Sequence, residues 1–171
     1  LIIIGTPSSP VTASYTIVNE PSCNGDGNGQ VDLITTTGGT LPYTYEWPAF
    51  GIVGSIASYS PPLLSAGVYT AIVTDVNGCT TESNIVYVAQ PTNPLSIFMD
   101  STDQSCITEG TATAYVLGGT PTYNYLWSPG GQSTATATAL TPNTTYSVLV
   151  TDANGCTITD QTYINGYRNI F

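Results

Sequence analysis

The chain is almost without positively charged side chains. It contains no histidine and no lysine, and Arg168 is the single cation among its 171 residues. Because phosphate binding requires clustered Lys and Arg, nucleic acid is excluded as a partner. Serine, cysteine and amine nucleophiles lack their usual base, so we do not expect an enzyme. The absence of histidine and of closely spaced cysteines also argues against a zinc site.

Long hydrophobic runs are absent too. No apolar run approaches the roughly 18 residues of a membrane-spanning helix, so we expect no membrane insertion in this segment. No basic region precedes an apolar core at the first residues, which is unlike a secretory leader. Charged residues make up only 7% of the chain, and 11 acids give it a net charge of −10. Solubility is therefore expected to depend on Thr, Ser, Asn and scattered carboxylates.

What the chain does contain is β-branched and aromatic residues. Hydrophobic residues make up 41% of it, Tyr, Val, Ile and Thr are frequent, and Gly and Pro punctuate every block. This composition predicts packed sheets and an all-β class. A carboxylate pair could in principle hydrolyse glycosides, but the recurring acids, Asp75 and Asp152, lie in turn motifs where capping of backbone NH groups explains them.

The chain repeats itself. The segment GGTLPYTYEW at 38–47 returns as GGTPTYNYLW at 118–127, and YTAIVTDVNGC at 69–79 returns as YSVLVTDANGC at 146–156. Cys23 aligns with Cys106 in the same order. Three collinear blocks predict two equivalent domains, which suits a length of 171 residues because a β-sandwich of this kind needs about 80 to 110 residues.

The domain boundaries follow from the alignment of the two copies. We expect sandwich repeats at 11–90 and 95–171, preceded by proline-containing linkers at 7–10 and 91–94. Residues 1–6 correspond to the last strand of a preceding repeat, or to a strand donated to another chain. The paired prolines fix φ and favour a short, extended connector.

Aromatic residues alternate with polar ones before each tryptophan. Tyr43 and Tyr45 precede Trp47 at a period of two, and the same spacing leads to Trp127, which predicts half-buried strands with core aromatics. A carbohydrate-stacking platform is the alternative. The later strands, 69–75 and 146–152, each end at an Asn-Gly pair that is expected to supply positive φ angles and reverse the chain. The expected fold is a tandem of immunoglobulin-like Greek-key β-sandwich repeats.

Two tyrosines begin these later strands. Tyr69 and Tyr146 follow Leu64 and Leu140 by five and six residues. This arrangement resembles a tyrosine corner, in which the hydroxyl bonds to upstream backbone. Together with Trp47 and Trp127, these tyrosines form the expected core signature.

Four cysteines occupy equivalent places in the two copies. Three pairings are possible. The repeat favours Cys23 with Cys79 and Cys106 with Cys156, because each domain could then fold alone. Closing a loop of about 56 residues would stabilise a domain by about 4 kcal/mol in the chain-entropy model. Disulfides imply an oxidising compartment, whereas free buried thiols in a cytosolic protein are the alternative.

Two surface chemistries rest on short motifs. Oxygen donors at Asn24, Asp26, Asn28 and Asp32, with Gly29 at the sixth place, imitate a calcium loop, but the twelfth place is Thr35 and the second copy lacks the pattern. A glycine-rich turn is therefore preferred over a calcium site, and no other cofactor is expected. Asn143 begins an Asn-Thr-Thr glycosylation sequon on an expected loop.

The combined motif, GGTxPYxYxW followed by GxYTxxVTDxNGC, closely resembles the SprB-type repeat of giant surface adhesins in Bacteroidota. It is also similar to polycystic-kidney-disease-like and other immunoglobulin-like modules. The resemblance covers both copies and implies long filaments exported by the type IX system to the cell surface, for adhesion or gliding, with no catalytic residues. It also implies O-glycosylation at triplets such as Asp100-Ser101-Thr102.

Three functions remain open. The repeats could be a structural spacer in a large adhesin, with further copies of the same repeat as neighbours along the chain. They could be subunits of a filament in which residues 1–4 complete the sandwich of an identical chain by strand addition. They could also be a lectin-like module whose exposed tyrosines bind an unknown surface or glycan ligand.

Overall fold

The computed structural model describes residues 9–54, 63–106 and 108–166. Within these residues every regular element is a strand and all strand pairs are antiparallel, which confirms the all-β class. The chain divides into two compact units, one made of Leu1–Pro21 and Gly25–Gln90 and the other of Ser22–Asn24 and Pro91–Phe171. The strand expected at 1–6, which includes the proposed donor strand, lies outside the described residues.

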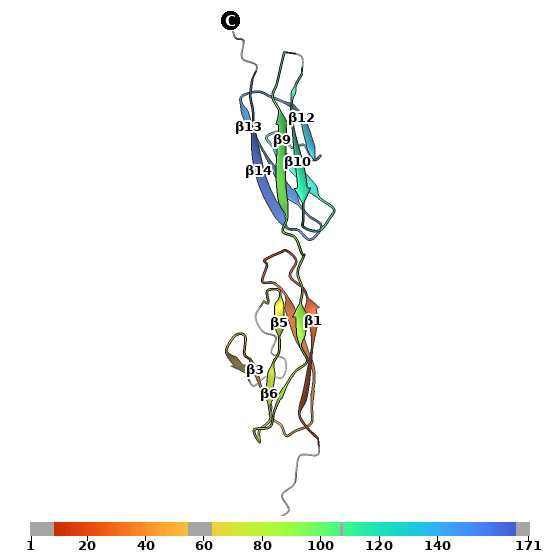
Figure 1. The fold of residues 1–171 in the computed structure, drawn as a ribbon, viewed down its shortest axis with the longest axis vertical. Helices are drawn as coiled ribbons and strands as arrows, with labels where there is room; N and C mark the ends of the chain where they lie inside the picture. Colours follow the sequence, from red (N-terminus) through yellow and green to blue (C-terminus); the bar gives the residue numbers. More distant parts are fainter. Residues whose placement is uncertain (1–8, 55–62, 107, 167–171) are drawn as a thin grey trace, which may run out of the picture. The chain divides into compact units, whose positions relative to one another are not determined.

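Unit 1 contains three small sheets (Figure 1). β1 pairs with β2, β4-β3-β6-β7 form the largest sheet, and β5 pairs with β8. The strands are β1 Thr12–Asn19, β2 Gln30–Thr37, β3 Thr44–Trp47, β4 Ile52–Gly54, β5 Gly67–Tyr69, β6 Ile72–Thr74, β7 Thr80–Glu82 and β8 Val86–Val88.

Unit 2 contains two sheets of three longer strands (Figure 1). Their orders are β12-β10-β9 and β11-β13-β14, so the chain passes from one sheet to the other between β10 and β11, between β11 and β12, and between β12 and β13. The strands are β9 Ser96–Thr102, β10 Gly110–Leu117, β11 Asn124–Ser128, β12 Thr136–Leu140, β13 Thr144–Thr151 and β14 Thr157–Ile164.

The core of unit 2 lies between its two sheets. Both sheets contribute fully buried side chains, with alternating burial along β10 and β13. Such alternation is what a sandwich requires, because successive side chains on a strand point to opposite faces. The buried cluster consists of Ala112, Ala114, Trp127, Ala137, Leu140, Tyr146, Val148, Val150 and Ile164.

Unit 1 has its own core around the other tryptophan. Trp47 is fully buried, and the ring of Tyr15 meets it edge-on with centroids 4.8 Å apart. Burial, together with nearby Tyr45, raises the pKa of Tyr15 to about 12, so this hydroxyl stays neutral. A second, smaller cluster in unit 1 consists of Val11, Tyr45 and Val73, so among the described residues copy 1 has two buried clusters and copy 2 has one.

The strand expected at 69–75 is in fact two strands. β5 ends at Tyr69 and belongs to one sheet, whereas β6 begins at Ile72 and belongs to another. Between them, the backbone NH of Ala71 donates to the hydroxyl of Ser83 at 3.0 Å, and the NH of Ser83 donates to the carbonyl of Ala71 at 2.8 Å. The serine hydroxyl thus takes the place of a strand carbonyl as the acceptor for the Ala71 NH, at the point where the chain passes from one sheet to the other. The periodicity of the residues does not reveal this hydrogen bond.

Candidate functional site

An aspartate organises the Asp-x-Asn-Gly-Cys turn of unit 2, between β13 and β14. Asp152 is 3% exposed and accepts three backbone hydrogen bonds, from Thr120 at 2.7 Å and from Asn154 and Cys156 at 2.9 Å each. The side-chain amide of Asn154 also donates to the hydroxyl of Thr120 at 3.0 Å. One carboxylate therefore ties the turn to the loop that begins with Gly118.

Unit 1 contains the same arrangement in the turn between β6 and β7. Asp75 accepts hydrogen bonds from the backbone of Thr40, Asn77 and Cys79, each at 2.9 Å. The amide of Asn77 donates to the Thr40 hydroxyl at 3.0 Å. The two turns are thus equivalent in their bonding as well as in their sequence.

The hydrogen bonds keep both carboxyl groups ionised. The NH of Cys79 is the largest cause that lowers the pKa of Asp75, against an opposing effect of desolvation. For Asp152, desolvation is the largest single effect and raises the pKa, but the hydrogen bonds from Thr120 and Cys156, among others, outweigh it and leave the pKa lowered. These acids are acceptors for the backbone, the role that their position in a turn predicted.

Each turn reverses the chain through a single glycine. Gly78 and Gly155 both have φ of +84°, and the NH of each bonds back to the carbonyl of the turn aspartate. Asn77 and Asn154 are not among the residues with positive φ. The expectation that both residues of each Asn-Gly pair take positive φ is therefore wrong, because the loop is one residue longer than a two-residue hairpin and only its last position is left-handed.

The cysteine pairing differs from the expected one. A disulfide joins Cys23 to Cys156, across a sequence separation of 133, with Cα atoms 5.7 Å apart. Cys79 and Cys106 are free and exposed. The pairing within each copy is therefore wrong, although the sites keep their equivalence: the bond takes the first type of cysteine from copy 1 and the second type from copy 2.

Chain geometry explains why Cys23 cannot reach Cys79. In unit 1 the turn lies beside the start of β1, because Cys79 shares a pocket with Ser9 and Val11. Cys23 comes four residues after Asn19, at the other end of β1. Eight strand residues span about 26 Å, and four residues can fold back by at most about 14 Å. About 12 Å therefore remains between Cys23 and the start of β1, where Cys79 lies. This exceeds the roughly 7 Å that a disulfide tolerates between Cα atoms.

Two hydrogen bonds accompany the disulfide in unit 2. The side-chain amide of Asn154 donates to the carbonyl of Ser22 at 3.0 Å, and the amide of Asn24 donates to the carbonyl of Pro91 at 2.8 Å. Residues 22–24 are thus held on both sides of the sulfur bridge. We call this set of residues, Ser22, Cys23, Asn24, Pro91, Asn154 and Cys156, the cystine site.

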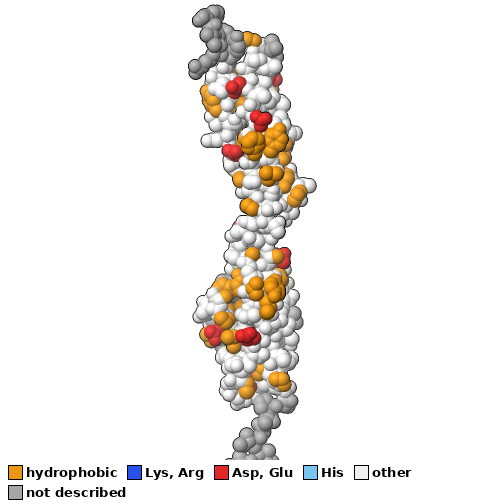
Figure 2. All heavy atoms as spheres, viewed as in Figure 1, with side chains coloured by type: hydrophobic (Ala, Val, Ile, Leu, Met, Phe, Trp, Pro, Cys, Tyr) orange, Lys and Arg blue, Asp and Glu red, His pale blue; other side chains and the backbone are white. Residues whose placement is uncertain are grey.

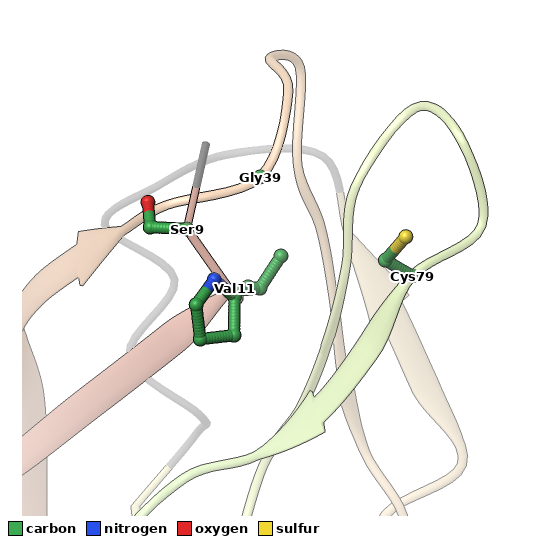
Figure 3. A pocket seen from close by; sticks show the side chains of 5 residues that line it. Ser9, Val11, Gly39 and Cys79 are labelled. Atoms are coloured by element: carbon green, nitrogen blue, oxygen red, sulfur yellow. The ribbon is translucent and has the colours of Figure 1, made fainter. Parts of the chain in front are cut away.

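A pocket of about 230 Å³ lies beside the free Cys79 in unit 1 (Figure 3). Ser9, Pro10, Val11, Gly39 and Cys79 line it. Figure 3 shows Val11 between Ser9 and Cys79, with the thiol at the edge of the space. Cys79 itself is exposed.

The aromatic residues singled out by their spacing lie in or against the cores. Tyr45 is 2% exposed and Trp47 is fully buried, while Tyr43 and Tyr123 are half-buried and donate their hydroxyls to the carbonyls of Gly38 and Gly118. The buried residues of this strand face the core and offer no platform for a sugar. The lectin-like hypothesis thus has no support in these residues.

The other two tyrosines of the signature bond to upstream backbone. The Tyr69 hydroxyl donates to the carbonyl of Ser65 at 2.9 Å. The NH of Thr141 donates to the Tyr146 hydroxyl at 3.1 Å. Tyr146 and Trp127 are buried in unit 2, and Tyr69 is half-buried against the core of unit 1. Each hydroxyl therefore bonds to backbone four or five residues upstream, as the resemblance to a tyrosine corner predicts.

The residues of the supposed calcium loop have separate structural positions. Asn24 donates its amide to the carbonyl of Pro91, and Asp26 and Asn28 lie in the irregular segment before β2. Asp32 lies within β2 opposite Thr16. Gly29 exchanges two backbone hydrogen bonds with Leu64, each at 2.8 Å, and a Cβ at Gly29 would lie 2.8 Å from the Leu64 carbonyl. Its glycine is explained by this close approach. The described residues contain no group of three or more His, Cys, Asp or Glu able to hold a metal ion.

The two glycosylation candidates differ in accessibility. Ser101 is half-buried on β9, and its hydroxyl lies 3.0 Å from that of Thr162. Asn143 is exposed in the turn before β13, with φ of +57°. Of the two, Asn143 presents the more accessible side chain, and modification at either site remains a prediction.

The surface carries scattered acids and several exposed apolar side chains. Figure 2 shows the acidic groups spread out on the visible face of each unit. On the outer face of β9 and β10, Phe98 and Tyr115 are cross-strand partners, 64% and 52% exposed, with ring centroids 6.1 Å apart. In the part of the chain that the structure describes, there is no helix long and apolar enough to cross a membrane.

Two partners in these sites were not anticipated from the sequence. The backbone NH groups of Thr40 and Thr120 donate to the turn aspartates. The Gly-Gly-Thr sequence that recurs in both copies is the signal that could have identified them. The recurrent Ser-Cys pair, Ser22-Cys23 and Ser105-Cys106, is the second signal. It marks the segment that enters the cystine site in one copy.

Comparison with known families bears on the same segments. The comparison with curated proteins finds no match. The family model described as SprB repeat matches residues 12–48 and 99–132, which are corresponding parts of the two copies. This is a structural repeat family whose members occur in cell-surface proteins. The chain therefore carries two SprB-type repeats.

Proposed function

We propose that this chain is a spacer segment of an extracellular surface adhesin or filament, in which the repeats set reach and resist tension while specificity for a ligand lies elsewhere. The type IX route and a role in adhesion or gliding belong to the same proposal. A disulfide fits this location, because disulfides persist in oxidising compartments outside the cytosol.

The residues that recur between the two copies support an architectural role. The turn aspartates, their threonine donors, the tryptophans and the hydrogen-bonded tyrosines all hold a unit together. The candidate ligand loop of copy 1, with Asp26 and Asn28, does not recur in copy 2. What the repeat preserves is therefore the fold of each unit and not a binding loop.

The disulfide that spans both copies is the observation that carries the proposal. When the chain is pulled by its ends, force passes from Cys23 to Cys156 through the sulfur bridge. Only residues 1–22 and 157–171 lie outside this loop, and they extend to about 130 Å at the limit. The full chain without the bond would extend to about 600 Å. The bond thus confines the extension of a loaded spacer.

Single-molecule pulling tests the mechanical part. We expect the oxidised chain to stop near the shorter length and the Cys156→Ser variant to reach the longer one. Equal extensions for the two proteins would mean that the bond does not confine the load.

Domain replacement in the surface protein tests the spacer role itself. Removal of residues 11–166 is expected to lower attachment of the producing cells under flow. Replacement by two unrelated β-sandwich domains of similar length should restore it, because a spacer contributes length and strength only. If attachment returns only with the native sequence, or if the isolated chain binds a glycan array, the repeats carry the specificity and the spacer role is refuted.

A further inference from the structure

The two free cysteines are of opposite types. Cys79 ends an Asp-x-Asn-Gly-Cys turn, as Cys156 does, and Cys106 belongs to a Ser-Cys pair, as Cys23 does. In the cystine site, one cysteine of each type is joined. We propose that Cys79 and Cys106 are complementary halves of a second site of this kind: Cys79 receives the Ser-Cys segment of another SprB-type repeat, here that of a second copy of this chain, and Cys106 supplies that segment.

The receiving side is already formed in unit 1. Asp75 holds the NH groups of Asn77 and Cys79 as Asp152 holds those of Asn154 and Cys156, with the same 2.9 Å distances. The amide that donates to Ser22 in the cystine site has its counterpart in Asn77, which is exposed. The adjoining pocket of about 230 Å³ gives the incoming segment room beside the sulfur.

The supplying side is formed in unit 2. Cys106 comes four residues after the last residue of β9, Thr102, as Cys23 comes four residues after the last residue of β1. The preceding residue is serine in both segments. Cys106 is exposed, and the NH of the preceding Ser105 donates to the carbonyl of Thr108 at 2.9 Å.

Bond formation is an ordinary two-electron oxidation. The thiols of Cys79 and Cys106 lose two protons and two electrons as the S–S bond forms, and a disulfide compound accepts them and is reduced to two thiols. In the test this oxidant is glutathione disulfide. The proposal does not depend on the spacer role, because it concerns only which cysteines join.

The test mixes two single variants. Cys79→Ser leaves only the thiol of Cys106, and Cys106→Ser leaves only that of Cys79, while both keep the Cys23–Cys156 bond. One variant carries an affinity tag, and the two are equilibrated together in a glutathione redox buffer. Random pairing would make half of the covalent dimers mixed. We expect mixed dimers to exceed each like dimer by about tenfold or more, and peptide mapping without reduction to show Cys79 bonded to Cys106.

Two results would overturn the proposal. The first is a random distribution of mixed and like dimers. The second is the absence of dimers at high protein concentration while both thiols still react with iodoacetamide. Each variant alone serves as the control for like pairing, and circular dichroism checks that both variants retain the fold.

Discussion

Replacement of Asp152 by alanine tests how much the turn contributes to unit 2. The variant loses the acceptor of three backbone NH groups, those of Thr120, Asn154 and Cys156. A hydrogen bond to a charged group contributes about 1.5–3 kcal/mol, but water that enters the space left by the removed carboxylate can replace part of it. We therefore expect the free energy of unfolding of unit 2 to fall by about 2–4 kcal/mol at neutral pH.

The effect should depend on pH with a definite sign. The folded-state pKa of Asp152 is lowered, so its contribution is present above the ordinary aspartate pKa and is lost as the pH falls through the lowered value. The difference between the wild type and Asp152→Ala should thus be large at neutral pH and narrow in strong acid. A carboxylate without these bonds would give no such change.

Urea unfolding provides the measurement. In a Trp47→Phe background, Trp127 is the only tryptophan and reports on unit 2 alone. Asp100→Ala is the matched control, because Asp100 is an exposed acid on β9 of the same unit. If Asp152→Ala is no less stable than this control, or if their difference is the same in acid and at neutral pH, the account of the turn is refuted.

Three further tests with variants use the same unfolding assay, and a fourth test titrates the thiols of the unchanged protein. Gly118→Ala should destabilise unit 2 more than Gly130→Ala; both have positive φ, but only a Cβ at Gly118 meets backbone, the carbonyl of Pro94. Val148→Ala should cost about 2–3 kcal/mol by leaving a cavity, whereas Leu149→Ala, on the exposed face of β13, should cost little. Tyr146→Phe should cost about 1 kcal/mol by removing the acceptor for the Thr141 NH. Under native conditions two cysteines should react with a thiol reagent, and after reduction and unfolding all four should react.

Local pattern was enough to predict the class and the principal strands. Alternation before each tryptophan placed the aromatic residues on the buried face of β3 and β11, because the period of a strand is two. The reversal at each Asp-x-Asn-Gly was also predictable, since a glycine is required at positive φ. The break between β5 and β6 was not, because it depends on the hydroxyl of Ser83, which lies just after the end of β7.

The disulfide pairing could not be reached from equivalence alone. Two pairing patterns treat equivalent cysteines alike. In a closed pattern one bond lies inside each copy, and in a stepped pattern each bond joins one copy to the next. The sequence shows the equivalence but not which ends of a domain the cysteines occupy. The length of β1 decides between the patterns, because it separates Cys23 from Cys79 by more than a disulfide can span.

A stepped pattern also determines what remains unpaired in a chain with two copies. A bond between Cys23 and Cys106 would leave two cysteines of the same type, and closed bonds would leave none. The observed bond, Cys23 with Cys156, leaves one of each type. Only a free pair of opposite types can form the same kind of bond with another repeat. The chain therefore carries one receiving thiol, Cys79, and one supplying thiol, Cys106. Repeated pairing of this kind extends in one direction from repeat to repeat.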